Sequence, residues 1–86
     1  MPCFVYVLES ARIRRYYTGS SEKPELRLEE HNLGKVDSTR AYRPWRIVRL
    51  EQYETRSEAC ARERYIKARK SRAWIENELL RKNAGL

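Results

Sequence analysis

Two tyrosines near the start of the chain are the first side chains that could do chemistry. Tyr6 lies in an apolar run, residues 4–8, with the aromatic and β-branched composition of a strand buried on both faces. Tyr17 lies in a second β-favouring run that ends at Gly19, a residue that tolerates a turn. The runs predict an antiparallel hairpin that brings both phenols to one site. The alternative is a pair of half-buried core tyrosines with hydrated hydroxyl tips.

Arg27 and His31 are the next pair with chemical potential. They are four residues apart in an expected helix of residues 24–33, so they share one face of it. Pro24 suits the first turn of that helix, and Gly34 suits the position just after its end. Such a pair could hold a phosphate and move a proton. The alternative for His31 is a surface histidine placed favourably at the C-terminal end of the helix dipole.

Glu63 is the third candidate, because of its position on a predicted helix of residues 55–70. At about 100° per residue, Glu63 falls on the same side of that helix as the apolar residues Ala59 and Ile66. A carboxylate on a core-facing side is costly unless it is paired or coordinates a cation. A metal ligand and an ion pair with Lys67, four residues on, are therefore both open interpretations.

The elements that must position these residues predict one small α+β domain spanning residues 1–86. A third strand is expected over residues 46–53, and a last helix, capped by Ser71, over about 72–82. The order strand-strand-helix-strand-helix-helix predicts a three-stranded antiparallel sheet flanked by helices, with room for one core of two layers. Inward-facing positions on the first and last helices are expected to be Leu26, Leu33, Trp74, Ile75, Leu79 and Leu80.

The charge balance indicates an anionic partner. The 86 residues carry 19 Lys or Arg against 12 Asp or Glu, a net charge of +7, and the stretch 62–72 holds six bases and one acid. Nucleic acid is the first candidate and an anionic membrane surface the second. We expect no membrane association, because the apolar residues are needed for the core and no stretch reaches transmembrane length. The sequence shows no signal peptide, so we expect a cytoplasmic protein. It also shows no glycine-rich phosphate loop, so we expect no organic cofactor.

The connection between the first helix and the third strand, residues 35–44, is polar and basic and shows no periodicity. Thr39, Arg40 and Arg43 are residue types that contact phosphates. A loop of this length in a small domain is often functional, although it could equally be a solvated linker. The two cysteines, Cys3 and Cys60, have no metal-ligand spacing, and free thiols are favoured over a disulfide.

Taken in order, these features resemble the GIY-YIG nucleases. The resemblance consists of Phe-Val-Tyr at 4–6, Tyr-Thr-Gly at 17–19, Leu-Arg-Leu-Glu-Glu-His-Asn at 26–32, Arg-Pro-Trp at 43–45 and the helical run at 57–67. It covers nearly the whole chain and is similar to the small single-domain members and to the nuclease domain of bacterial excision-repair incision proteins. The two name-giving tripeptides are degenerate here, but both tyrosines are retained.

The resemblance implies metal-dependent hydrolysis of phosphodiester bonds. It implies Tyr6 as general base, Tyr17 as the group that orients water or phosphate, and Arg27 as the phosphate clamp. It also implies that His31 assists proton transfer or holds a phosphate oxygen, and that Glu63 is the sole protein ligand of one Mg²⁺ or Mn²⁺. Further contacts to the nucleic acid or the site are expected from Lys23, Thr39, Arg40, Arg43, Lys67 and Asn77.

DNA is favoured over RNA by analogy with the family alone. Trp45 and Trp74 could stack on unpaired bases, although a place in the core is favoured for both. The rival hypothesis is a basic module that binds nucleic acid without cutting it, and a weaker one is a small ribosome- or RNA-associated protein. Glu63 argues against a pure binder, because an acid among six bases repels phosphate unless a cation lies between them.

Overall fold

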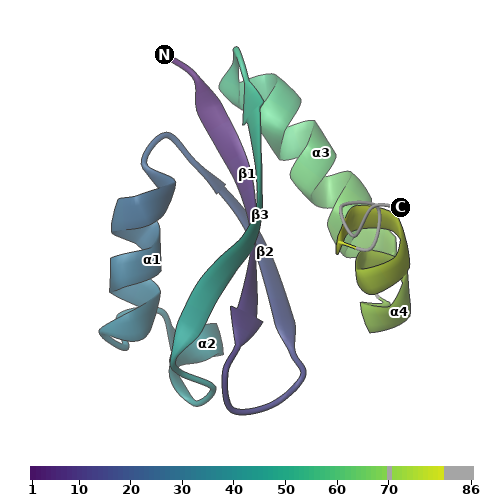
Figure 1. The fold of residues 1–86 in the computed structure, drawn as a ribbon. Coiled ribbons are helices and arrows are strands. Elements are labelled where there is room, and N and C mark those ends of the chain that lie inside the picture. Colours follow the sequence, from purple (N-terminus) through teal and green to yellow (C-terminus); the bar gives the residue numbers. More distant parts are fainter. Residues whose placement is uncertain (70, 81–86) are drawn as a thin grey trace.

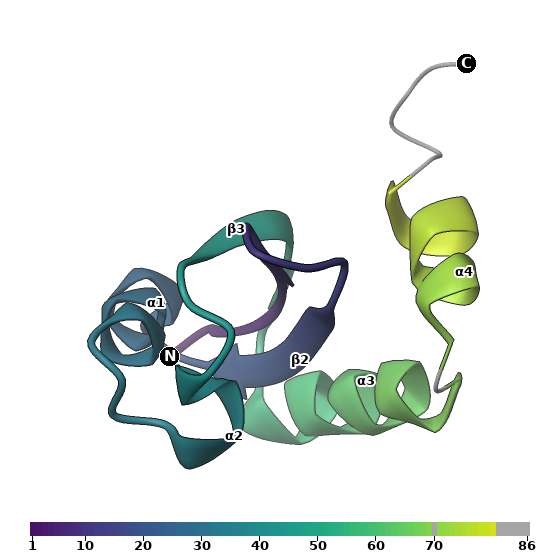
Figure 2. The ribbon, with the colours of Figure 1, turned by 90° about the horizontal axis from the view of Figure 1, so that it is seen from below.

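The architecture is a three-stranded antiparallel sheet between two helical layers. The structure is a computed structural model that describes residues 1–69 and 71–80. Strands β1 (Cys3–Ser10), β2 (Tyr16–Ser21) and β3 (Trp45–Tyr53) form the sheet in the order β2-β1-β3. Helices α1 (Pro24–Asn32) and α2 (Asp37–Arg40) lie on one side of the sheet, and α3 (Arg56–Arg69) and α4 (Arg72–Trp74) on the other (Figures 1 and 2). The α+β class and the antiparallel hairpin are thus confirmed.

The core has two halves, one on each face of β1. Cys3, Val5 and Val7 face α3 and belong to one buried cluster, whereas Tyr6 and Leu8 belong to another on the α1 side. The expectation of a two-layered core was therefore wrong. A central strand with apolar side chains on both faces needs a cover on each face, and α1 supplies the second cover.

Helix α1 presents a different face to the sheet from the one expected. Leu26 and Leu33 remain 49% and 66% exposed, whereas Leu28 packs against the core and His31 is fully buried. The predicted inward stripe was wrong, and so was the surface alternative for His31. Gly34 ends the helix as predicted, with a φ of +82° that favours glycine.

The segment between α1 and β3 is more ordered than its sequence indicates. Residues Asp37–Arg40 form the short helix α2, where an irregular connection was expected. Thr39 lies buried inside it, and its backbone oxygen accepts a 2.9 Å hydrogen bond from the indole of Trp45. Trp45 is buried, which confirms its expected place in the core. The buried indole of Trp45 needs a hydrogen-bond acceptor, and the helical turn of α2 provides one in the Thr39 carbonyl.

Local capping signals set the last helices as predicted. The Thr55 hydroxyl accepts a bond from the Glu58 amide, and the Glu58 carboxylate accepts one from the Thr55 amide, so the capping box is present. Ser71 caps α4 by accepting from the Trp74 amide. The helix then continues as the π-helical segment η1 (Ile75–Leu80), where a regular helix was expected. Its expected end, near residues 82–85, lies outside the described residues.

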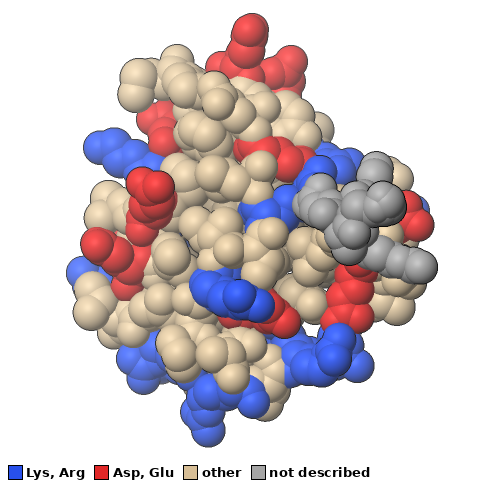
Figure 3. All heavy atoms as spheres, viewed as in Figure 1, with Lys and Arg blue, Asp and Glu red and all other residues tan. Residues whose placement is uncertain are grey.

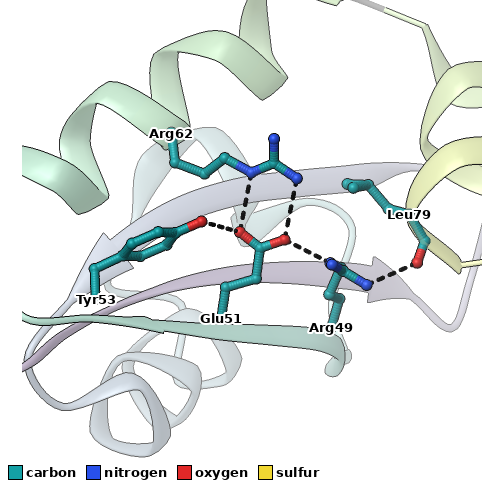
Figure 4. Close-up of polar contacts among 5 residues, drawn as sticks. All are labelled: Arg49, Glu51, Tyr53, Arg62 and Leu79. Carbon is teal, nitrogen blue, oxygen red and sulfur yellow. Dashed lines mark hydrogen bonds and ion pairs between the residues drawn. The ribbon is translucent and has the colours of Figure 1, made fainter.

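A carboxylate between β3 and α3 joins the second helical layer to the sheet (Figure 4). The Glu51 side chain, 13% exposed, accepts two hydrogen bonds from Arg62 at 3.0 and 3.2 Å and one from Arg49 at 2.7 Å. Tyr53 donates a fourth at 2.8 Å, and Arg49 also donates to the Leu79 carbonyl of η1. Burial alone would raise the pKa of Glu51, but these donors outweigh it and lower that pKa to about 2. This cluster fixes α3 and η1 against β3.

The surface charge is unevenly distributed. In the view of Figure 3, Lys and Arg gather at the lower end, whereas Asp and Glu lie at the upper end and along both sides. The lower end is formed by the β1–β2 connection, α2 and the residues around it (Figure 1). Arginines on these segments are Arg12, Arg14, Arg15, Arg40, Arg43 and Arg46. Within the described ranges no helix is long and apolar enough to cross a membrane.

Candidate active site

The two tyrosines meet on the α1 face of the hairpin, as predicted. Tyr6 on β1 pairs with Gly19 on β2, and Leu8 pairs with Tyr17, so both phenols project from the same face. Their ring centroids are 6.4 Å apart. A Cβ at position 19 would lie 2.5 Å from the Tyr6 hydroxyl oxygen. Gly19 is therefore required by the close passage of the Tyr6 phenol over β2. The strand end and turn expected at Gly19 were wrong, because β2 continues through this residue to Ser21.

His31 is the buried centre of a chain of polar contacts. Its Nδ1 lies 2.8 Å from the Thr39 hydroxyl, which donates its proton to the Val36 carbonyl at 3.3 Å. The hydroxyl has one proton, so we assign the Nδ1–H tautomer to His31. Its Nε2 is then an acceptor, and it lies 3.4 Å from the Tyr6 hydroxyl oxygen.

Burial sets the protonation states of these two groups. It raises the pKa of Tyr6, and the nearby Arg27 guanidinium, which lowers that pKa, does not fully compensate. Burial also lowers the pKa of His31, and the positive charge of Arg27 lowers it further. At neutral pH the site therefore holds a protonated phenol beside a neutral imidazole that can accept its proton.

Arg27 stands on the same helical face as His31, as their spacing predicted. Its guanidinium pairs with the Glu30 carboxylate at 2.6 Å and remains partly exposed. It lies close enough to Tyr6 to influence the pKa of the phenol. A partly exposed guanidinium beside the tyrosine pair is placed to meet a phosphate that arrives from solvent.

Glu63 lies on α3, in the helical layer on the other side of the sheet, and its side chain contacts the edge strand β2. Its Oε1 accepts a 2.6 Å hydrogen bond from the Ser20 hydroxyl, and its Oε2 lies 2.8 Å from the Lys67 ammonium. The carboxylate side chain is 19% exposed, so it sits at the rim of the core and not within it. The ion pair with Lys67, one of the two interpretations left open, is present. Lys67 Nζ also lies 5.6 Å from the Tyr17 ring centroid, which links Glu63 to the tyrosine face.

The other predicted contacts fall into three groups. Lys23 lines a hollow together with Ser20 and Arg27, at the edge of the site. Arg40 and Arg43 are exposed on and just after α2, at the basic end, and Asn77 is exposed on η1. Thr39 differs from expectation: it is 1% exposed and holds His31, so it is not presented to a phosphate on the surface.

Two residues of the site, Glu30 and Ser20, went unnoticed in the sequence, and a third, Thr39, was expected in a different role. Glu30 pairs with Arg27 three residues earlier, and this helical spacing was a readable signal. Ser20 holds Glu63 across 43 positions, and Thr39 holds His31 across a turn whose shape the sequence did not indicate. No local pattern connects either residue to its partner, so only the folded arrangement reveals them.

A family model described as the GIY-YIG catalytic domain matches residues 2–77. The chain belongs to the GIY-YIG family. This is a family of nucleases, so the resemblance seen in the sequence is confirmed. The five residues that the resemblance singled out, Tyr6, Tyr17, Arg27, His31 and Glu63, all lie inside the matched range.

Relatives of known sequence and structure agree with this membership. A UPF0213 protein of Staphylococcus aureus strain Mu3 is 40% identical over 65 residues, 74% of this chain and 78% of that protein. The protein SA0446 of strain N315 gives the same figures. The solution NMR structure of the UPF0213 protein BH0048 from Bacillus halodurans shares 28% identity and a TM-score of 0.53, covering 91% of this chain and 86% of that one. The GIY-YIG fold is therefore shared with a solved structure.

Proposed function

We propose that this GIY-YIG chain is a divalent-metal-dependent endonuclease that hydrolyses phosphodiester bonds in DNA. One observation carries the proposal: two phenols, an imidazole, a guanidinium and a carboxylate converge from both helical layers at the edge of β2. These groups match the needs of the reaction, which are a base for water, a cation for the developing charge and a carboxylate for a metal. DNA is preferred to RNA by analogy with the family.

Tyr6 and His31 would act together as the base. The pKa of Tyr6 is raised, so the phenol cannot serve as a free phenolate at neutral pH. Instead, Tyr6 would take a proton from the attacking water while passing its own proton to His31 Nε2, 3.4 Å away in the resting geometry. Thr39 would hold the imidazole in the tautomer that leaves Nε2 open.

Arg27 and Tyr17 would bind the scissile phosphate. Arg27 carries a permanent charge at the mouth of the site and would stabilise the extra negative charge of the transition state. Tyr17 lies beside both members of the base pair, with its ring centroid 4.8 Å from that of His31 and 6.4 Å from that of Tyr6. Its hydroxyl would orient the phosphate or the water against the base.

Glu63 is the residue that would hold Mg²⁺ or Mn²⁺. Among the residues that the structure describes, no three His, Cys, Asp or Glu side chains gather into a metal cage. The donor chemistry fits a hard cation bound by one carboxylate, with water and substrate oxygens as the other ligands. A bound cation there would supply Lewis-acid stabilisation of the leaving oxygen.

Lys67 occupies one oxygen of that carboxylate, at 2.8 Å. Its ammonium neutralises Glu63 when no other cation does so, which keeps the acid from repelling DNA. The Lys67 ammonium also lies 5.6 Å from the Tyr17 ring centroid, where it would be able to meet an incoming phosphate. Lys67 would therefore contribute to nucleic-acid binding.

The experiment that tests this function is incubation with labelled single-stranded, duplex and branched DNA, beside RNA of the same sequence. Each is incubated with Mg²⁺ or Mn²⁺ and, separately, with EDTA. We expect internal cleavage of at least one DNA with metal and none with EDTA. Salt-sensitive binding with no cleavage of any substrate in either metal would instead identify the non-catalytic binder.

A further inference from the structure

A second hollow adjoins the candidate active site at the start of β2. It has a volume of about 520 Å³, within the range of ligand pockets, and lies between β2, the end of α3 and the start of the last helical segment. Tyr17 and Lys67 line it and also belong to the candidate site, so the hollow borders that site. We refer to this hollow as the flanking pocket. None of the roles assigned so far uses it.

The flanking pocket combines an apolar floor with a basic rim. Ile66 is buried, and Tyr16 and Ile75 are half-buried and pack against the same core cluster. The rim carries four cations, which are Arg14, Arg15, Lys67 and Arg72. A ligand that fits both parts has a flat apolar portion and an attached anion.

The nearby carboxylates cancel only part of this positive charge. Glu63 pairs with Lys67 at 2.8 Å. Glu76 pairs with Arg14 at 2.6 Å and accepts a hydrogen bond from the Tyr16 hydroxyl. Arg72 donates to the Arg14 backbone carbonyl at 2.9 Å, which is an uncharged acceptor, so its own charge stays available to a ligand. Burial, and then the bond to Glu76, raises the pKa of Tyr16 to about 12, so the phenol adds no negative charge at neutral pH.

We propose that the flanking pocket binds one nucleotide of the substrate strand, next to the scissile phosphate. The base would lie against Tyr16 and Ile75, and the phosphate would meet Arg72. This inference rests on the proposed function, because it takes a nucleic acid as the substrate. The shared wall formed by Tyr17 and Lys67 places this nucleotide beside the residues assigned to cleavage.

Binding of a mononucleotide tests the pocket without any cleavage. Thymidine 5′-monophosphate is titrated into ¹⁵N-labelled protein in EDTA, and amide chemical shifts are followed. Thymidine and inorganic phosphate are titrated separately. We expect shifts at residues 16–18, 66–67 and 71–75, and an affinity at least about tenfold above that of either part, because the joined parts bind as one ligand.

Two charge reversals on neighbouring positions give a matched comparison. Arg72→Glu should weaken nucleotide binding at least about tenfold, because it removes the phosphate partner and adds a repelling acid. Arg69→Glu changes the net charge equally, but Arg69 lies over the Tyr65 ring and not in the pocket, so it should change binding less than about twofold. Both positions are exposed, and melting curves check that each variant is folded.

Shifts confined to other residues, equal effects of the two variants, or phosphate binding as tightly as the nucleotide would overturn the proposal. The titration of the parent protein decides the first and third of these without any variant. A protein that binds the nucleotide here but cuts no DNA contradicts the nuclease proposal alone. A protein that cuts DNA but does not bind the nucleotide here contradicts the flanking pocket alone.

Discussion

Single side chains in this site depend on one another for their chemistry. A buried Tyr6 with a raised pKa is a poor base on its own, and a buried His31 with a lowered pKa has no contact with bulk solvent. Placed 3.4 Å apart, they form a path along which a proton can move from phenol to imidazole. The path depends on Thr39, which the sequence placed among surface phosphate contacts.

The titration of His31 tests the direction of its pKa shift. The chain contains one histidine, so its imidazole signal in proton NMR is unambiguous. We expect a midpoint below the ordinary value of about 6.5 in the folded protein, and the ordinary value in urea. Because the folded pKa is the lower one, the free energy of unfolding should fall as pH drops below about 6.5, and cleavage should fall with the loss of neutral His31. A folded midpoint at or above the urea value would contradict the assigned acceptor role.

The sequence predicted the identity of the site residues better than their contacts. Residue type and helical spacing were enough to group Arg27 with His31, and hairpin pairing was enough to group Tyr6 with Tyr17. Two interpretations of Glu63 stayed open, because the wheel position cannot distinguish an apolar core from the rim of a sheet. The observed rim position follows from β2 being an edge strand, which leaves Glu63 next to Ser20 and Lys67.

At the scale of elements, the position of Glu63 depends on how firmly α3 is held. Arg62, the residue before it, makes two hydrogen bonds to Glu51 of β3, and Arg49 extends the same cluster to η1 (Figure 4). This arrangement restricts rotation of α3 about its axis. The cluster therefore supports the site from the far edge of the sheet, without touching it.

Glu51→Gln should destabilise the protein by about 2–3 kcal/mol at pH 7, the range for losing hydrogen bonds to a buried charge. Chemical denaturation measures this change. The folded pKa of Glu51 is lowered from 4.5 to about 2, so its contribution is complete above pH 4.5 and is lost as the pH falls towards 2. The stability difference between parent and variant should shrink over the same interval.

Glu54→Gln is the matched control, because Glu54 is exposed in the turn before α3. It should change stability by less than about 0.5 kcal/mol. Equal stability of the Glu51 and Glu54 variants at pH 7 would mean that the cluster does not hold α3 in place.

The starts and ends of helices were predictable where a local signal sets them. The helix face that packs against the sheet was not predictable. Pro24, Gly34, the Thr55 box and Ser71 act within one turn, and the structure confirms each of them. The prediction for the inward face of α1 was wrong because it placed the apolar Leu26 and Leu33 in the core and not His31. The bonds of His31 to Tyr6 and Thr39, which are distant in sequence, decide that face instead. Helix α2 and the π-helical segment likewise carry no local signal that distinguishes them.

At the scale of the whole molecule, the charged residues behind the net charge of +7 are unevenly distributed over the surface. On the face drawn in Figure 3, bases gather at the end formed by the β1–β2 connection and α2, whereas acids lie at the opposite end and along the sides. A polyanion would be drawn to the basic end, which also borders the flanking pocket through Arg14 and Arg15. The sequence predicted the charge itself, but this separation depends on the folded arrangement.

Salt dependence measures the contribution of the basic end. The double variant Arg40→Ala/Arg43→Ala should weaken DNA binding and reduce the slope of log affinity against log salt by up to about 2, one unit for each phosphate that is no longer neutralised. Arg69→Ala removes one charge from the outer face of α3, above Tyr65, and should leave the slope within about 0.5 of the parent. An unchanged slope in the double variant would make the segment around α2 a structural connection only.

The central claim is that Tyr6 and Glu63 carry out phosphodiester cleavage, and single-turnover cleavage by two conservative variants tests it most directly. Tyr6→Phe removes one oxygen and keeps the packed ring, so the rate should fall at least about 10²-fold. Glu63→Gln keeps the shape but removes the charge that would hold the metal, so cleavage should collapse while DNA binding persists. Thermal melts should show both variants folded. Two folded variants that cleave as fast as the parent would contradict the claim.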